Sequence, residues 1–147
     1  TAEQLHLTLR FIGDVQESLA ADIDDALAAI RAPAFTLELA GVGEFGGKIP
    51  RAIWAGVRPN DDLMHLQRKI ETAMQRLGLE PEGRKFTPHV TLARLRESSS
   101  HQVAEYLSQR GHFRSPPFSV SRFVLFSSRA SVGGGPYVVE AAYPLAA

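Results

Sequence analysis

The sequence of 147 residues contains no cysteine, only three lysines and no formal net charge at pH 7. Without cysteine the chain has no disulfide framework, no thiolate metal ligand and no thiol nucleophile. Without a basic excess it lacks the broad electrostatic footprint of proteins that wrap duplex nucleic acid. Its apolar runs are interrupted well before the roughly 20 residues that a membrane span needs. These absences exclude a disulfide-stapled domain, a transmembrane protein and a duplex-wrapping protein.

The composition is that of an ordinary globular domain, with 44% hydrophobic and 22% charged residues. The length suits one domain that buries its own core. We therefore expect residues 1–147 to form a single, monomeric domain with two lobes. No basic segment followed by an apolar block opens the sequence, so we expect no signal peptide and a cytoplasmic protein with no membrane contact.

Arginine supplies almost all of the positive charge, because the lysines among the 16 basic residues are only Lys48, Lys69 and Lys85. Guanidinium groups bind phosphate in a bidentate manner, so a small local anion site stays open. A base-composition bias in the source genome is the alternative explanation.

Hydrophobic periodicity predicts both strands and helices. Alternation predicts strands over residues 4–12, 35–39, 51–57, 87–95, 118–127 and 137–145. Helical spacing predicts helices over residues 16–31, 60–78 and 101–110. Each half of the chain repeats a strand-helix-strand-strand order, and many strands have one polar face. This pattern favours an α+β fold of two mostly antiparallel sheets with helices on the outside.

A short motif occurs once in each half, as His6-Leu-Thr8 and as His89-Val-Thr91. Positions i and i+2 of a strand share a face, so each motif presents an imidazole beside a hydroxyl. The residue between them points to the core. If the halves are related by pseudo-twofold symmetry, the two pairs face each other across a central cleft.

Two imidazoles and two hydroxyls suit chemistry at phosphorus. The imidazoles of His6 and His89 provide an acid and a base near neutral pH. The hydroxyls of Thr8 and Thr91 can donate hydrogen bonds to phosphate oxygens. We expect neither a metal nor another cofactor, since no compact set of histidines and carboxylates lies beside either motif. A chance repeat remains open, as does a zinc site formed by the two histidines and a distant carboxylate.

Two longer stretches resemble the paired motifs of the 2H phosphoesterase superfamily. They are His6-Leu-Thr-Leu-Arg-Phe-Ile-Gly-Asp14 and Phe86-Thr-Pro-His-Val-Thr-Leu-Ala-Arg94. Within that superfamily they are similar to the RNA 2′,3′-cyclic phosphodiesterases, also known as 2′-5′ RNA ligases. Stretches 51–56, 123–128 and 143–145 resemble the same family in the same order. The resemblance implies a bilobal α+β fold whose motifs line a central cleft.

The resemblance also implies an activity. The expected reaction is metal-independent hydrolysis of 2′,3′-cyclic phosphate ends of RNA or nucleotides to 2′-phosphomonoesters. The resemblance also allows 2′-5′ RNA ligation by the same site. A nucleotide- or RNA-end-binding module without turnover is the competing class. The presence of both complete His-x-Thr motifs favours the enzyme. Family members begin with a further strand and helix, so we expect residues ahead of Thr1 to be missing from this sequence.

The resemblance assigns roles to individual residues. It makes His6 the acid and His89 the base, places Arg94 on the phosphate and stacks Phe11 on a base. Strict alternation would put Arg94 and Phe11 on the core face, so both roles require a bulge or twist after each motif. Core packing is the alternative for Phe11.

The other candidate residues carry weaker signals. We expect the histidines outside the two motifs to be solvated side chains: His65, His101 and His112. Trp54 either stacks on a nucleobase or packs in the core.

Overall fold

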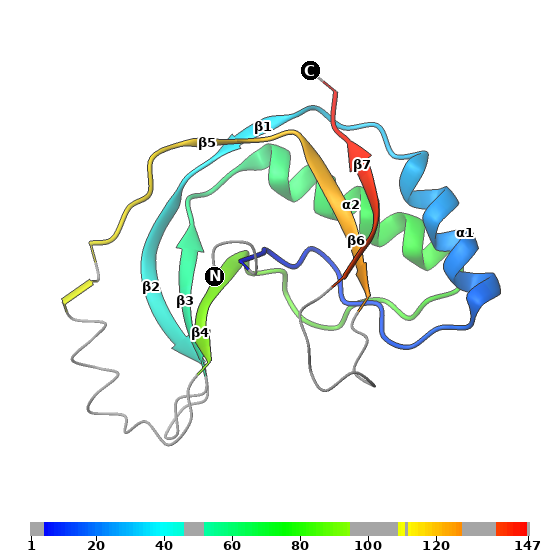
Figure 1. Cartoon of the computed structure of the whole chain (residues 1–147), viewed down its shortest axis with the longest axis horizontal. Coiled ribbons are helices and arrows are strands. Elements are labelled where there is room, and N and C mark those ends of the chain that lie inside the picture. Colours follow the sequence, from blue (N-terminus) through cyan, green and yellow to red (C-terminus); the bar gives the residue numbers. More distant parts are fainter. Residues whose placement is uncertain (1–4, 46–51, 95–108, 111, 128–137, 147) are drawn as a thin grey trace. The chain divides into compact units, whose positions relative to one another are not determined.

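The computed structural model describes residues 5–45, 52–94, 109–110, 112–127 and 138–146 (Figure 1). The helices are α1 (Glu17–Ala28) and α2 (Asp61–Arg76). The strands are β1 (Phe35–Leu37), β2 (Leu39–Phe45), β3 (Ala52–Val57), β4 (His89–Arg94), β5 (Phe118–Val120), β6 (Arg122–Ser127) and β7 (Val138–Pro144). β2 pairs with β3, β3 with β4 and β6 with β7, all antiparallel, so the predicted α+β class is confirmed. β1 and β5 form a further two-stranded sheet.

The chain divides into two compact units, each assembled from three segments. Unit 1 contains Thr1–Thr8, Thr36–Asn60 and Thr87–Phe118. Unit 2 contains Leu9–Phe35, Asp61–Phe86 and Ser119–Ala147. The units therefore do not coincide with the two halves of the sequence, because each takes segments from both halves. The pseudo-twofold symmetry and the central cleft stay predictions.

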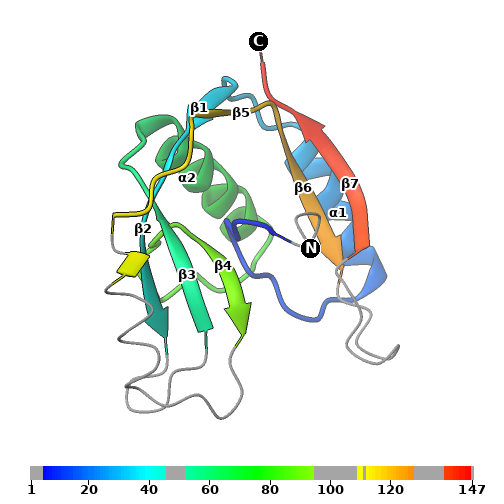
Figure 2. The ribbon, with the colours of Figure 1, turned by 60° about the vertical axis from the view of Figure 1, so that its left-hand side comes forward.

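Unit 1 is built on a sheet in which β2, β3 and β4 lie side by side (Figure 2). Alternate residues of β3 form its core face, where Ile53 is 7% and Ala55 is 0% exposed. Isolated antiparallel bridges extend the sheet at both edges. Leu7 bridges to Val90 beyond β4. At the other edge, the bridge between Ala40 and Arg114 lies beyond β2.

Unit 2 packs α1 against α2 and β7. Its core contains apolar side chains from both helices and from the β6–β7 pair: Ile23, Leu27, Leu63, Leu66, Ile70, Met74, Phe123 and Tyr143. The buried Tyr143 donates a hydrogen bond of 2.6 Å to Oδ1 of Asp24. Burial first, and then this hydrogen bond and the charge of Asp24, raise the pKa of the Tyr143 hydroxyl. The hydroxyl of Tyr143 therefore stays protonated and donates its hydrogen bond to Asp24.

The ends of α2 follow from its sequence. Asp61 and Asp62 occupy the first turn, where carboxylates interact favourably with the helix dipole. At the other end Gly78 has a φ of +93°. The N–H of Leu79 donates to the carbonyl of Met74 at 3.2 Å, which closes a Schellman turn. The predicted end near Gly78 is thus confirmed. Neither α1 nor α2, the helices of the described part, is long and apolar enough to cross a membrane.

Two predicted elements differ from the structure, and a third lies mostly outside the described residues. The strand predicted over residues 4–12 is reduced, among residues 5–12, to the single bridge at Leu7. The strand predicted over residues 118–127 is interrupted at Ser121, whose carbonyl accepts a hydrogen bond from the N–H of Leu145. Residues 101–108 of the predicted third helix lie outside the described residues, as does His101.

Candidate active site

The two histidine–threonine motifs lie in neighbouring segments of unit 1, joined by the antiparallel bridge between Leu7 and Val90. In an antiparallel pair, residues opposite each other share a face, and the next residues along each chain point to the other face. The four motif residues therefore share the face opposite to Leu7 and Val90. Across the two segments the opposed positions are His6 with Thr91, and Thr8 with His89. We call these four residues the histidine–threonine cluster.

The cluster lies on an accessible face of the sheet. Thr8 is exposed, and the other three side chains are partly exposed. On the opposite face Val90 is only 9% exposed. The local alternation thus anchors β4 through Val90 and leaves the imidazoles and hydroxyls within reach of a ligand.

The imidazole of His89 has a defined tautomer. Its Nδ1 lies 2.9 Å from the carbonyl oxygen of Thr87. A carbonyl oxygen only accepts hydrogen bonds, so Nδ1 carries the proton in the neutral ring. Nε2 is then the nitrogen that can accept a proton, which is the state that a general base requires.

Trp54 lies on the same face as the cluster. It pairs with Thr91 across the β3–β4 register, and its ring centroid is 6.3 Å from that of His89 at an interplanar angle of 57°. On β2 the partner of Trp54 is Gly43, where an added Cβ would lie 2.2 Å from Cζ2 of the indole. The indole therefore lies over Gly43 and beside His89. Its partial exposure shows that Trp54 is not a fully buried core residue.

The bulge expected after the second motif is present in β4. Thr91 pairs with Trp54, and the backbone of Arg94 pairs with that of Ala52. These partners are two positions apart on β3, whereas Thr91 and Arg94 are three apart on β4, so β4 contains one extra residue. The bulge shifts the backbone register at Arg94 by one position from strict alternation.

Phe11 follows the first motif and is 73% exposed, so core packing is the wrong interpretation of this residue. The neighbouring Arg10 is turned inward instead. Its Nε lies 2.7 Å from Oε1 of Glu71 on α2, with the two side chains only 7% and 18% exposed. Arg10 also donates hydrogen bonds to the carbonyls of Phe11 and Glu80. This arrangement fixes the backbone that carries Phe11 within unit 2.

The pKa of Glu71 reflects opposing influences. Burial alone would raise it, but hydrogen bonds from Arg10, Gln75 and the Glu82 N–H, together with the charge of Arg10, outweigh that effect. The pKa of Glu71 therefore lies below its ordinary value, and the carboxylate stays ionised. The sequence analysis missed this ion pair because alternation gave Arg10 the polar face of a strand and no local pattern connected it to α2.

The remaining histidines of the described part, His65 and His112, are exposed as expected. Among the described residues, no three histidine, aspartate or glutamate side chains are grouped so as to hold a metal ion. The zinc alternative thus has no ligand set in the part of the chain that the structure describes.

Comparison with known proteins finds relatives by sequence and similar chains among solved structures. An RNA 2′,3′-cyclic phosphodiesterase of Aeropyrum pernix is 43% identical over 64% of this chain and 54% of its own length. One of Geobacillus stearothermophilus is 37% identical over 97% of this chain and 46% of its own length. This chain thus spans about half the length of these two relatives. Escherichia coli LigT in complex with 3′-AMP superimposes with a TM-score of 0.75 at 28% identity, over 99% of this chain and 79% of that one.

The family model of the 2′-5′ RNA ligase superfamily matches residues 1–131. The match includes both histidine–threonine motifs, β4 and the segment that bridges to it. From its motifs, its fold and this match, the chain belongs to the 2′-5′ RNA ligase superfamily.

Proposed function

We propose that the chain hydrolyses 2′,3′-cyclic phosphate ends of RNA or nucleotides to 2′-phosphomonoesters. The observation that carries the proposal is the Leu7–Val90 bridge, because its register gathers two imidazoles and two hydroxyls on one accessible face. Relatives named RNA 2′,3′-cyclic phosphodiesterase support the same reaction.

The histidines divide the proton transfers. His89 removes a proton from water through Nε2 as the water oxygen attacks phosphorus, and its Nδ1–H bond to Thr87 supports this role. The bond between phosphorus and the 3′-oxygen breaks, and His6 protonates that oxygen. The products are a 2′-phosphate and a free 3′-hydroxyl, and one proton has moved from His6 to the product while another has reached His89. Proton exchange with solvent restores the starting state.

Neighbouring hydrogen-bond donors stabilise the negative charge on the phosphate oxygens. The hydroxyls of Thr8 and Thr91 donate to the non-bridging oxygens, on the same face as the imidazoles. Arg94 stabilises the negative charge that grows in the transition state. The bulge in β4 supports this role, since it brings the position of Arg94 into the alternation of Thr91.

Phe11 is proposed as the platform on which the terminal base stacks. Its exposure of 73% leaves the ring available, and base–aromatic stacking contributes about 1–3 kcal/mol. We propose no metal and no other cofactor for the reaction. Ligation would use the same displacement with a 5′-hydroxyl in place of water, so that a 2′-5′ phosphodiester forms as the bond between phosphorus and the 3′-oxygen breaks.

The direct test is incubation of the protein with a 2′,3′-cyclic nucleotide in the presence of EDTA, with phosphorus NMR to identify the product. We expect a 2′-phosphomonoester and no 3′-phosphomonoester. His6→Ala and His89→Ala should each lower kcat by about 10²–10⁴-fold. His65→Ala is the matched control, because His65 is an exposed histidine on α2 and outside the cluster.

Two outcomes would contradict the proposal. Binding of the nucleotide without turnover would favour the alternative of a non-catalytic RNA-end-binding module. Turnover that needs a divalent ion would contradict the metal-independent mechanism.

A further inference from the structure

The face that carries the histidine–threonine cluster continues across the sheet of unit 1 to its other edge. Gly56 of β3 pairs with His89. The register shift in β2 then sets Ala40 and Gly41 against Gly56, where an added Cβ would lie 2.8 Å from the Ala40 carbonyl oxygen. Beyond β2, Ala40 bridges to Arg114. Between His89 and Arg114, this row of the sheet therefore contains no side chain larger than a methyl group.

Arg114 is on the same face of the sheet as the cluster. Leu39 pairs with Val57, which shares the core-face alternation of the buried Ala55. Ala40, the next residue on β2, falls on the opposite face, and Arg114 lies across from it. Residues opposite each other in an antiparallel pair share a face. The guanidinium thus belongs to the accessible face and not to the core face.

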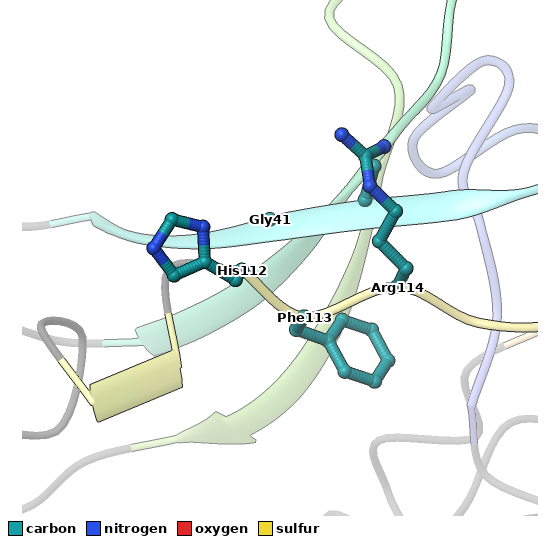
Figure 3. Close-up of a pocket in the computed structure, with 5 residues that line it drawn as sticks. Gly41, His112, Phe113 and Arg114 are labelled. Carbon is teal, nitrogen blue, oxygen red and sulfur yellow. The ribbon is translucent and has the colours of Figure 1, made fainter.

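A hollow of about 260 Å³ lies at this edge, lined by Ala40, Gly41, His112, Phe113 and Arg114. In Figure 3 the imidazole of His112 and the guanidinium of Arg114 flank Gly41, while the ring of Phe113 points away from the guanidinium. The N–H of Gly41 donates to the carbonyl of Phe113 at 2.8 Å, so the backbone of the hollow is fixed. Both basic side chains are exposed.

We propose that this hollow is a phosphate subsite for a nucleotide upstream of the cyclic end of an RNA strand. This inference rests on the proposed function. Segment 112–115 lies three strand spacings from β4, which is roughly 14 Å at ~4.8 Å per spacing. That separation exceeds one phosphodiester unit, so the phosphate that reaches Arg114 belongs to the preceding part of the strand. The Arg114 fork suits such a phosphate, and His112 adds a second donor.

The small residues between the two sites explain how a strand would reach the subsite. The floor of glycine and alanine is low, and the indole of Trp54 lies against it at Gly56, where an added Cβ would be 3.5 Å from Cζ3. A sugar–phosphate backbone would therefore cross the sheet from His89 to Arg114 beside this ring. The chain has no net charge, so phosphate binding must come from local groups of this kind and not from a broad basic surface. The subsite makes oligonucleotides better substrates than mononucleotides.

The test compares 2′,3′-cyclic AMP with a tetraribonucleotide that ends in a 2′,3′-cyclic phosphate, using Arg114→Gln. We expect KM for the tetranucleotide to rise by about tenfold, as loss of a charge-assisted contact implies. For cyclic AMP, kcat/KM should stay within about twofold of wild type, because no phosphate reaches the subsite. For the tetranucleotide, the slope of log KM against log salt concentration should be about 0.7 smaller in Arg114→Gln than in wild type. This is the value for the loss of one phosphate contact on a single strand.

Arg122→Gln is the matched control, since Arg122 is an exposed arginine on β6 of unit 2 and should leave both substrates unaffected. Equal losses on both substrates with Arg114→Gln, or no change in KM and in the salt dependence, would overturn the subsite. Absence of turnover in wild type would contradict the proposed function instead. In that case the subsite is tested by binding, measured as the fluorescence anisotropy of a labelled tetraribonucleotide that bears a 3′-phosphate. The subsite requires that Arg114→Gln bind this oligonucleotide more weakly than wild type and that Arg122→Gln bind it equally well.

Discussion

The Nδ1 atom of His89 donates a hydrogen bond to the carbonyl oxygen of Thr87, two residues earlier and 2.9 Å away. The contact lies where the chain enters β4, so the backbone that starts the strand also orients the ring. The Leu7–Val90 bridge then sets Thr8 opposite this ring and His6 opposite Thr91. The arrangement of the cluster therefore depends on backbone register as much as on the identity of its side chains.

The division of labour between the histidines can be tested with the leaving group. An activated aryl phosphodiester needs no protonation when its phenolate leaves, so loss of the acid should matter far less on this substrate. We expect His6→Ala to lose about 10²–10⁴-fold on a cyclic phosphate and much less on the aryl diester. His89→Ala should be impaired on both, as measured by kcat. Rescue of His89→Ala in place of His6→Ala would reverse the two roles.

Arg94 should act on the transition state more than on substrate binding. Arg94→Ala should lower kcat/KM for a cyclic nucleotide by about 10²–10³-fold, as for other lost donors to a developing anion. Arg94→Lys retains the charge but not the fork, so it should recover only part of this loss. Steady-state kinetics of both variants against wild type provide the measurement. Wild-type kinetics in Arg94→Ala would remove this residue from the site.

The Arg10–Glu71 ion pair should contribute to stability in a pH-dependent manner. Glu71→Gln leaves the guanidinium of Arg10 without a charged partner, so we expect the free energy of unfolding at pH 7 to fall by about 1–3 kcal/mol. The pKa of Glu71 is lowered in the folded state, so its contribution is present above the unfolded value of about 4.3 and is lost as the pH falls through the folded value. The difference between wild type and variant should therefore shrink below about pH 4.

Urea unfolding at several pH values measures this difference. Glu38→Gln is the control, because the Arg58–Glu38 pair has side chains that are 57% and 31% exposed and should contribute less than about 1 kcal/mol. Equal destabilisation by the two variants, or a difference for Glu71→Gln that grows in acid, would contradict the assignment.

The sequence predicted the elements whose periodicity is strong. Both described helices, the strands around β3 and β4 and the end of α2 near Gly78 follow from apolar spacing and turn residues. The motif also located the cluster, since positions two apart on a strand share a face. The requirement for a bulge came from the phosphate-binding role that the resemblance implies for Arg94, since strict alternation would have placed this residue on the core face.

What the sequence could not predict depends on contacts between distant segments. Alternation continued the first strand through Arg10, but the ion pair with Glu71 turns this side chain away, and Phe11 becomes exposed. The exchange of segments between the units was also missed, since each half of the sequence has a self-consistent order of elements. Arg114 carried no local signal, because its place opposite Ala40 depends on a bridge between segments far apart in the chain.

The contact between Gly43 and Trp54 gives a last prediction that needs no substrate for its first readout. A Cβ at position 43 would lie 2.2 Å from Cζ2 of the indole, a separation that forces the ring to move. Trp54 is the single tryptophan of the chain, so its fluorescence reports this movement without interference. We expect Gly43→Ala to shift the emission maximum and, because the indole lies beside His89, to lower kcat by about 3–30-fold, or about 0.7–2 kcal/mol. The matched control is Gly83→Ala, since an added Cβ at Gly83 has no heavy atom within 4 Å outside its neighbours. Unchanged emission and kcat in Gly43→Ala would show that the indole does not depend on this glycine and does not position the imidazole of His89.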